Sequence, residues 1–429
     1  MRTFLFLILA ICISTTSVQG QLLKNLEQKA KAKMEQRANN KVDKAMDKGL
    51  DKVEEGTKVK KVENGNAKTK EGDVTNPASQ GETASLKSYS KFDFVPGEKI
   101  VYSEDFSQDV IGEFPAKWNT NGSGELMTID GQPGKWLNLQ VSTKYESAYT
   151  ATAPDNYTIE FDVITDFKNG SQAVPWIGVK LEEIVPSGYS YAGTFELSLN
   201  PNSGTSHSDI QDAISFYSKD RGGNVFFSNK TQHHGAFTKA NESNAPVHVA
   251  IWVQKQRVRV WLNEKKEFDI PRALAAGVQF KKFIFETTTG GGDFSYFISN
   301  IKVAAALPDT RSKLITEGKW STTGILFDVA SDKIKPSSYA VLKQIAATLQ
   351  ENEGLKIRII GHTDNDGDNA ENLNLSKRRA LAVKVALAKE FAIDDTRIQT
   401  DGKGETEPAD KNLTTEGKAN NRRVEFVKS

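Results

Sequence analysis

The chain has 429 residues, which is more than one hydrophobic core usually supports and indicates two or three domains. Its 56 basic and 55 acidic residues nearly cancel, so the composition does not indicate a nucleic-acid-binding protein, which would carry a clustered basic surplus. Aromatic residues make up 9% of the chain and include six tryptophans, so part of the chain should bury a substantial core.

Residues 1–20 have the pattern of a secretory signal peptide. Arg2 supplies the positively charged n-region, residues 5–13 form a short apolar run, and small residues at 18–20 mark a cleavage site. The run is too short to span a bilayer, and no other segment approaches that length, so we predict an exported chain without a transmembrane span.

The only cysteine, Cys12, lies within this apolar run. Lipid attachment would require a small residue before it, whereas Ile11 is large and β-branched, so the sequence disfavours a lipoprotein. Cleavage near Gly20 leaves a mature chain without cysteine and therefore without disulfide bonds.

Residues 21–56 predict an amphipathic, charged helix, because apolar side chains recur at every fourth position between charged ones. Two interpretations stay open: a solvated single helix, and a helix that self-associates or lies on a membrane surface. Residues 57–91 are rich in Lys, Glu, Asn, Thr, Ser and Gly and nearly lack large apolar residues, which predicts a disordered linker.

Residues 92–307 contain short alternating segments separated by turn residues, which predicts an all-β antiparallel sandwich of the jelly-roll type. Segments 247–253 and 257–262 flank a short turn and predict a hairpin. This region loosely resembles the laminin-G and concanavalin-like jelly rolls. Most tryptophans of a sandwich belong to its core, but one or two exposed ones could stack on sugar rings. A glycan is therefore one candidate ligand of this domain, and a protein is another. The tryptophans in question are Trp118, Trp136, Trp176, Trp252 and Trp261.

Glu160 and Asp162 alternate on one face of a predicted strand, as do the acids of some glycosidases. The third acid of that pattern is missing, because Ile164 and Thr165 stand in its place. Solvated acids on a half-buried strand are the commoner explanation, so hydrolysis of a glycan is the alternative and not the expected function.

Residues 308–429 change pattern and predict a small α+β domain with the element order βαβαββ. A short strand ends at residues 327–328, helices cover 338–349 and 372–391, and strands cover 355–361, 397–400 and 423–427. Neither zinc-site spacing, an EF-hand loop nor a nucleotide-binding fingerprint occurs in the chain, so we expect no cofactor and no metal site of these types. A structural calcium ion in the loops of residues 92–307 stays open.

Several motifs follow one another in this last region. They are Gly361-His362-Thr363-Asp364, Asn372, Leu375-Ser376-Lys377-Arg378-Arg379-Ala380, Gly402-Lys403-Gly404, Pro408, Asn412, Gly417 and Asn421-Arg422-Arg423-Val424-Glu425. In this order and spacing they resemble the OmpA-like family over residues 324–428. The string departs from the family's usual pattern at Ala330, Lys403 and Lys418.

This resemblance implies non-covalent binding of peptidoglycan through the diaminopimelate residue of its stem peptide. By the same resemblance, Asp364 meets the ammonium group of that residue, Arg379 meets its carboxylate, and Thr363 and Asn372 help line the pocket. An anion and a cation held close together suit a zwitterion, and an arginine can grip a carboxylate with two parallel bonds. The competing interpretation is that Asp364 and Arg379 form an ordinary salt bridge.

The sequence therefore predicts a non-enzymatic protein of the periplasm, associated with the cell wall and with the outer membrane as a further candidate location. The alternative is a hydrolase directed at glycans or the wall, with the C-terminal domain as its targeting module. A motility stator component would share this domain but would need a transmembrane helix.

Overall fold

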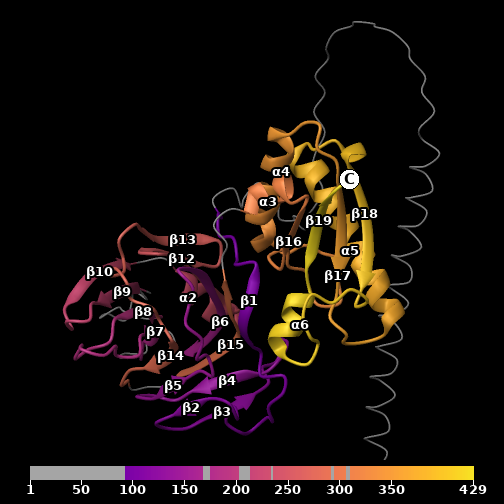
Figure 1. Ribbon diagram of the computed structural model, residues 1–429. Helices are drawn as coiled ribbons and strands as arrows, with labels where there is room; N and C mark the ends of the chain where they lie inside the picture. Colours follow the sequence, from indigo (N-terminus) through magenta and orange to yellow (C-terminus); the bar gives the residue numbers. More distant parts are fainter. Residues whose placement is uncertain (1–91, 168–173, 202–212, 233–234, 291–293, 306–309) are drawn as a thin grey trace, which may run out of the picture. The chain divides into compact units, whose positions relative to one another are not determined.

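The computed structural model describes residues 92–167, 174–201, 213–232, 235–290, 294–305 and 310–429 (Figure 1). The signal peptide, the helix at 21–56 and the linker at 57–91 lie outside the described residues and stay predictions. The boundary expected between residues 307 and 308 also falls outside them. All the described residues belong to one compact unit.

The middle of the chain forms two sheets in which every pair of neighbouring strands is antiparallel. Strands of the larger sheet are β1 (Lys99–Glu104), β3 (Gly124–Met127), β4 (Trp136–Leu139), β6 (Asn156–Phe167), β11 (Val247–Gln254), β12 (Arg257–Leu262), β13 (Lys265–Ile270) and β15 (Phe294–Ala305). Their order is β13-β12-β11-β6-β15-β4-β3, with β1 also paired to β15.

The second sheet is built from the remaining strands of this region. They are β2 (Asn119–Thr120), β5 (Lys144–Glu146), β7 (Ile177–Glu182), β8 (Thr194–Asn200), β9 (Ala213–Lys219), β10 (Val225–Gln232) and β14 (Lys282–Thr287). Their order is β10-β9-β8-β7-β14-β5-β2. One short helix, α2 (Ala236–Ser243), interrupts the strands and was not expected from the sequence.

The two sheets face each other across a core of alternating apolar side chains. In β11, Val247, Val249 and Ile251 are fully buried, as the period of two in a strand predicts. Phe161 of β6 lies with its ring centroid 5.1 Å from that of Phe285 in β14, so side chains of both sheets interlock. The expected antiparallel β middle region is confirmed, while its jelly-roll path stays a prediction.

The C-terminal region is a mixed sheet with helices, as expected (Figure 1). Its elements are α3 (Thr310–Thr316), β16 (Lys319–Thr322), η2 (Pro336–Ser338), α4 (Tyr339–Glu351), β17 (Ile357–His362), α5 (Asn369–Phe391), η3 (Asp395–Arg397), β18 (Ile398–Gly404), α6 (Thr415–Asn421) and β19 (Val424–Lys428). The strand order is β16-β19-β17-β18, in which only β17 and β18 are parallel.

The detailed βαβαββ order is not confirmed in this region. The first strand is β16, whereas Phe327, where we expected a strand to end, makes only an isolated bridge with Ile334. A helix, α6, also separates the last two strands. The hydroxyl group of Thr414 accepts a hydrogen bond from the amide of Gly417, which closes the first turn of this short helix.

Helix α5 is fixed at its start and along its contact with the sheet. The carboxylate of Asp368 accepts hydrogen bonds from the amides of Ala370 and Glu371 and caps the helix. Glycines at 361 in β17 and 402 in β18 let the helix approach both strands at Ser376. A β-carbon at Gly361 would lie only 2.2 Å from the carbonyl oxygen of Ser376.

Replacing Gly361 by alanine should therefore lower the free energy of unfolding by roughly 1–3 kcal/mol, because the helix backbone has to move away from the strand. Gly354→Ala is the matched control, because a β-carbon there meets no atom within 4 Å. Urea denaturation followed by circular dichroism measures both variants. Equal stability of the two would contradict the close packing of α5 on β17.

The segment before β1 connects the outer face of the larger sheet with the C-terminal core. The ring centroid of Phe94 lies 5.1 Å from that of the buried Trp261 in β12. Both rings belong to the same apolar cluster as the C-terminal Trp320. The amide side chain of Asn420 also exchanges hydrogen bonds with the backbone of Ile100, at 2.9 and 3.0 Å. Residues on the outer face of the larger sheet are therefore packed against residues of the C-terminal region.

Candidate functional site

A cavity of about 700 Å³ opens where β17 ends and α5 begins. All four residues that the sequence analysis selected line it, namely Thr363, Asp364, Asn372 and Arg379. The same wall carries Arg378, Arg422 and several carboxylates, so charges of both signs face one space.

Asp364 is nearly buried, and only 7% of its surface is exposed. One carboxylate oxygen lies 2.5 Å from Nη1 of Arg422, and the other accepts a hydrogen bond of 3.2 Å from the amide of Asp366. The acid is therefore held in place by the loop and by a cation from the far end of the chain. Its salt-bridge partner is Arg422. The competing interpretation, in which Asp364 forms an ordinary salt bridge with Arg379, is therefore wrong.

Arg379 is held in the lining of the same cavity by its Nε, which donates a hydrogen bond of 3.0 Å to the carbonyl oxygen of Ser331. Its guanidinium carbon lies 4.9 Å from the ring centroid of Phe327. Burial and the neighbouring Arg378 and Arg422 lower its pKa below that of an exposed arginine. The two terminal nitrogens have no hydrogen-bond partner among the described residues, so the fork of this arginine is available to a carboxylate.

Asn372 and Thr363 differ in what they do in the pocket. The side-chain amide of Asn372 donates to the carbonyl oxygen of Asp366 at 3.0 Å and to Glu405 at 2.7 Å, which ties the loop after β17 to the start of α5. Thr363 is 4% exposed, and its hydroxyl group has no partner among the described residues. Asn372 therefore shapes the loop, and Thr363 keeps a free polar atom.

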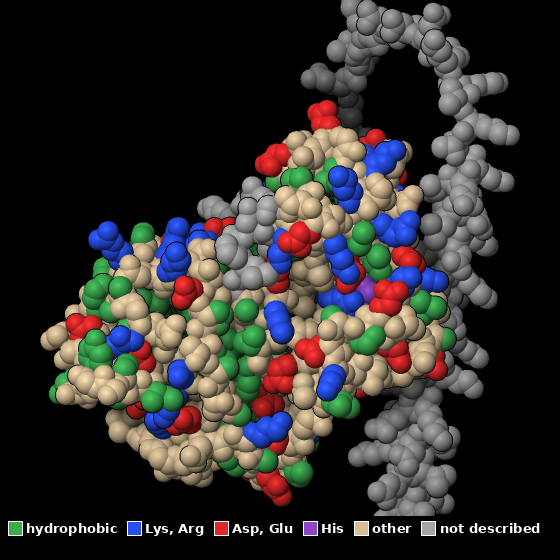
Figure 2. All heavy atoms as spheres, in the orientation of Figure 1, with side chains coloured by type: hydrophobic (Ala, Val, Ile, Leu, Met, Phe, Trp, Pro, Cys, Tyr) green, Lys and Arg blue, Asp and Glu red, His purple; other side chains and the backbone are tan. Residues whose placement is uncertain are grey.

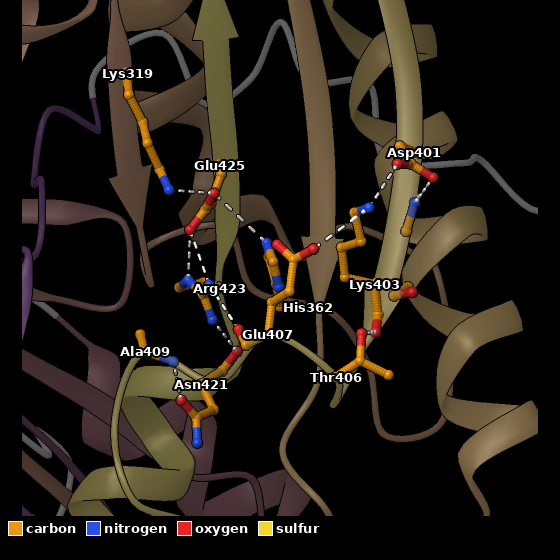
Figure 3. Close-up of polar contacts among 12 residues, drawn as sticks. Lys319, His362, Asp401, Lys403, Thr406, Glu407, Ala409, Asn421, Arg423 and Glu425 are labelled. Carbon is orange, nitrogen blue, oxygen red and sulfur yellow. Dashed lines mark hydrogen bonds and ion pairs between the residues drawn. The ribbon is translucent and has the colours of Figure 1, made fainter. Parts of the chain in front are cut away.

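Arg422 and Arg423, the two adjacent arginines before β19, have separate roles, which could not be predicted from the sequence. Arg422 faces the cavity and pairs with Asp364, as described above. Arg423 is buried, and Figure 3 shows it beside Glu425, together with Lys319 and His362. Its Nε lies 2.9 Å from Glu425, so it holds the sheet together and does not reach the cavity.

Two of the departures from the family pattern are also explained by ion pairs. Lys418 of α6 lies 2.7 Å from Asp366 and fixes the loop beside the cavity. Lys403 of β18 pairs with Asp401 and Glu407 at 3.5 and 3.4 Å, outside the cavity lining (Figure 3). Ala330 lies in the lining but has a positive φ of 53° and brings no polar group.

The acids of the hydrolase hypothesis lie elsewhere, on the outer face of the larger sheet. His248 of β11 bridges them, with one ring nitrogen 2.7 Å from Asp162 and the other 3.3 Å from Glu160. Burial alone would raise the pKa of Asp162, but the bonds to His248 and Asn300 outweigh it and lower the pKa. Asp162 is therefore an ionised carboxylate that His248 and Asn300 hold in place.

The candidate sugar-stacking tryptophans are mostly core residues. Trp118, Trp136 and Trp261 are at most 6% exposed, whereas Trp176 is 37% exposed. Figure 2 shows acidic and basic side chains interspersed over the face that it draws. Within the residues that the structure describes, no helix is long and apolar enough to cross a membrane, and no group of three or more side chains is placed to hold a metal ion.

These observations define a class of structure: a small mixed α/β region whose central strand ends at a pocket lined by charges of both signs. The model of the OmpA family matches residues 326–422. The outer-membrane lipoprotein YfiB of Pseudomonas aeruginosa is 35% identical over 126 residues, which cover 29% of this chain and 74% of that protein. Through this region the chain belongs to the OmpA family.

Other similarities are restricted to the same region. Outer membrane porin F of Pseudomonas aeruginosa is 40% identical over 101 residues, which cover 24% of this chain and 29% of that protein. The chain spans about half or less of the length of this and two further curated relatives. The solved peptidoglycan-associated lipoprotein of Burkholderia pseudomallei is 29% identical and covers 25% of this chain and 89% of its own, with a TM-score of 0.23, which establishes no common fold over the whole chain.

Proposed function

We propose that this chain is a non-enzymatic protein of the cell envelope that binds peptidoglycan non-covalently through residues 308–429. The diaminopimelate end of a stem peptide would lie between Asp364 and Arg379, with its ammonium group at the acid and its carboxylate at the arginine. The proposed location is the periplasm, at the cell wall. Residues 92–307 form the second proposed domain, which the C-terminal domain would hold at the wall.

The observation that carries this proposal is that the carboxylate of Asp364 and the guanidinium group of Arg379 line one cavity. The carboxylate of Asp364 is already fixed, and the terminal nitrogens of Arg379 have no partner among the described residues. Groups that are fixed before the ligand arrives lose little conformational freedom on binding. Each charge-assisted bond contributes about 1.5–3 kcal/mol, so one such site should bind in roughly the micromolar to millimolar range.

A pair of matched peptides tests this assignment. Diaminopimelate differs from lysine by one carboxylate on the carbon that carries the side-chain amine. We therefore expect L-Ala-γ-D-Glu-lysine to bind roughly 10- to 100-fold more weakly than L-Ala-γ-D-Glu-diaminopimelate, because it lacks the group that Arg379 would grip. Isothermal titration of the purified chain measures both affinities.

The same titration with Arg379→Ala should remove the difference between the two peptides. Lys389→Ala is its control, because Lys389 lies on the same helix, is exposed and does not line the cavity. Equal affinity of the wild-type protein for both peptides would show that this site does not bind the additional carboxylate of diaminopimelate.

A further inference from the structure

A second cavity, of about 630 Å³, adjoins the cavity lined by Asp364 and Arg379, which we call the diaminopimelate pocket. One side of it is the outer face of the larger sheet, where β6, β11 and β15 lie next to one another. The opposite side is formed by C-terminal residues between 326 and 337. Asp105, Phe327 and Val329 line both this cavity and the pocket with Asp364, so the two spaces share a wall.

The floor of the second cavity is a fixed polar cluster. His248 stands opposite Asp162 in the register of β11 with β6, and its imidazole ring reaches both Asp162 and Glu160. The side-chain amide of Asn300 donates to the second oxygen of Asp162 at 2.8 Å. Burial alone would lower the pKa of His248, but its bonds to Asp162 and Glu160 outweigh burial and raise the pKa to about 10. The ring is therefore protonated at neutral pH and uses both nitrogens internally.

Free polar atoms remain beside this cluster. Within the described residues, Oε1 of Glu160, the side-chain amide nitrogen of Asn263 and the amine of Lys302 have no hydrogen-bond partner. All three residues line the cavity. The site thus offers one hydrogen-bond acceptor and two donors to a ligand. Asn263 is held in place because its side-chain oxygen accepts a hydrogen bond from the backbone amide of His248.

The charged side chains that line the cavity are equal in number for the two signs. The four carboxylates are those of Asp105, Glu160, Asp162 and Glu264. The four cations are Lys135, Lys302, Lys335 and the protonated His248. With equal numbers of acids and bases, the lining has no net charge that would select a simple anion or a simple cation. Apolar side chains complete the lining, and Val329 among them is 81% exposed.

We propose that this cavity binds a neutral N-acetylated sugar of the same peptidoglycan strand whose diaminopimelate occupies the neighbouring pocket. Hydroxyl and acetamido groups would use the free acceptor and donors, and the methyl and C–H surfaces would lie against Phe327 and Val329. Because the two cavities share lining residues, a sugar joined to a stem peptide in one cavity would lie beside the other. This inference rests on the proposed function, because the stem peptide positions the sugar.

Two soluble ligands separate this inference from the function on which it rests. One is the tripeptide L-Ala-γ-D-Glu-diaminopimelate, and the other is the same tripeptide attached to its N-acetylated disaccharide. We expect the chain to bind the disaccharide form at least tenfold more tightly than the bare tripeptide. Isothermal titration of the purified chain measures both.

The variants Glu160→Gln and Lys302→Ala should lose this gain and keep the affinity for the bare tripeptide, because neither side chain lines the diaminopimelate pocket. Glu182→Gln on the other sheet is the control and should keep both affinities. A gain that survives in both variants, or equal binding of the two ligands by the unchanged chain, overturns the sugar site and leaves the peptide site standing. Failure of both ligands to bind overturns the sugar site and the proposed function together.

Discussion

Replacing Asp364 by asparagine is expected to weaken binding of a diaminopimelate stem peptide roughly 10- to 100-fold without unfolding the chain. Asparagine keeps an oxygen for the amide of Asp366, which now donates to the carboxylate at 3.2 Å, so the loop after β17 should persist. It removes the charge that would meet the ligand's ammonium group. Arg422 loses its partner, but its side chain is 42% exposed and can be hydrated.

Titration of the peptide into both proteins measures this effect, and circular dichroism checks that they fold alike. Asp395→Asn serves as the control, because that carboxylate is exposed and lies outside the cavity. Unchanged affinity in Asp364→Asn would contradict the role of Asp364, whatever the outcome for Arg379.

The second large effect is on stability. Arg423→Ala should lower the free energy of unfolding by about 3–5 kcal/mol, because it leaves Glu425 buried with less compensation. Arg423 and Glu425 are 8% and 5% exposed, and the arginine also donates a hydrogen bond of 3.0 Å to the carbonyl oxygen of Glu407 (Figure 3). Lys319 would remain as a partner of Glu425, at 2.7 Å.

Urea denaturation measures this loss, and Lys403→Ala is the contrasting variant. Lys403 makes two ion pairs, but it lies at the surface, where water screens them, so its removal should leave stability unchanged. A loss in Lys403→Ala as large as that in Arg423→Ala would show that burial does not decide the effect.

The same buried acid predicts a pH dependence. Burial alone would raise the pKa of Glu425, but the nearby His362, Lys319 and Arg423 outweigh it and hold the pKa well below the usual range. The stabilisation is therefore fully present above the pKa of an unfolded glutamate, about 4.3, and is lost as pH falls below it toward the folded value. In Glu425→Gln, the free energy of unfolding should depend less on pH between about 5 and 3.

Regular patterns in the sequence predicted elements well where one face of an element is buried. The hairpin of β11 and β12 was expected at nearly its observed bounds, because the alternation of its side chains matches a half-buried sheet. The start of α5 was placed three residues late, although Asp368 is a common type of helix cap and could have marked it. Strand β16 was missed because four residues are too few to show a period.

The candidate pocket could be predicted only in part. The motif string selected four residues that the structure brings to one cavity. Adjacent positions cannot reveal which of Arg422 and Arg423 faces it, since that depends on how the chain leaves α6 and enters β19. The bridge from His248 to Glu160 and Asp162 depends on the register of two strands that lie far apart in the sequence.

The central claim is that this chain binds the cell wall through the pocket between Asp364 and Arg379. Co-sedimentation of the purified chain with isolated peptidoglycan sacculi, beside folded Asp364→Ala and Arg379→Ala variants, tests it most directly. We predict that the unchanged chain pellets with the sacculi and that both variants stay in solution. An unchanged chain that stays in solution, or three proteins that pellet alike, would contradict the assignment of this pocket to peptidoglycan.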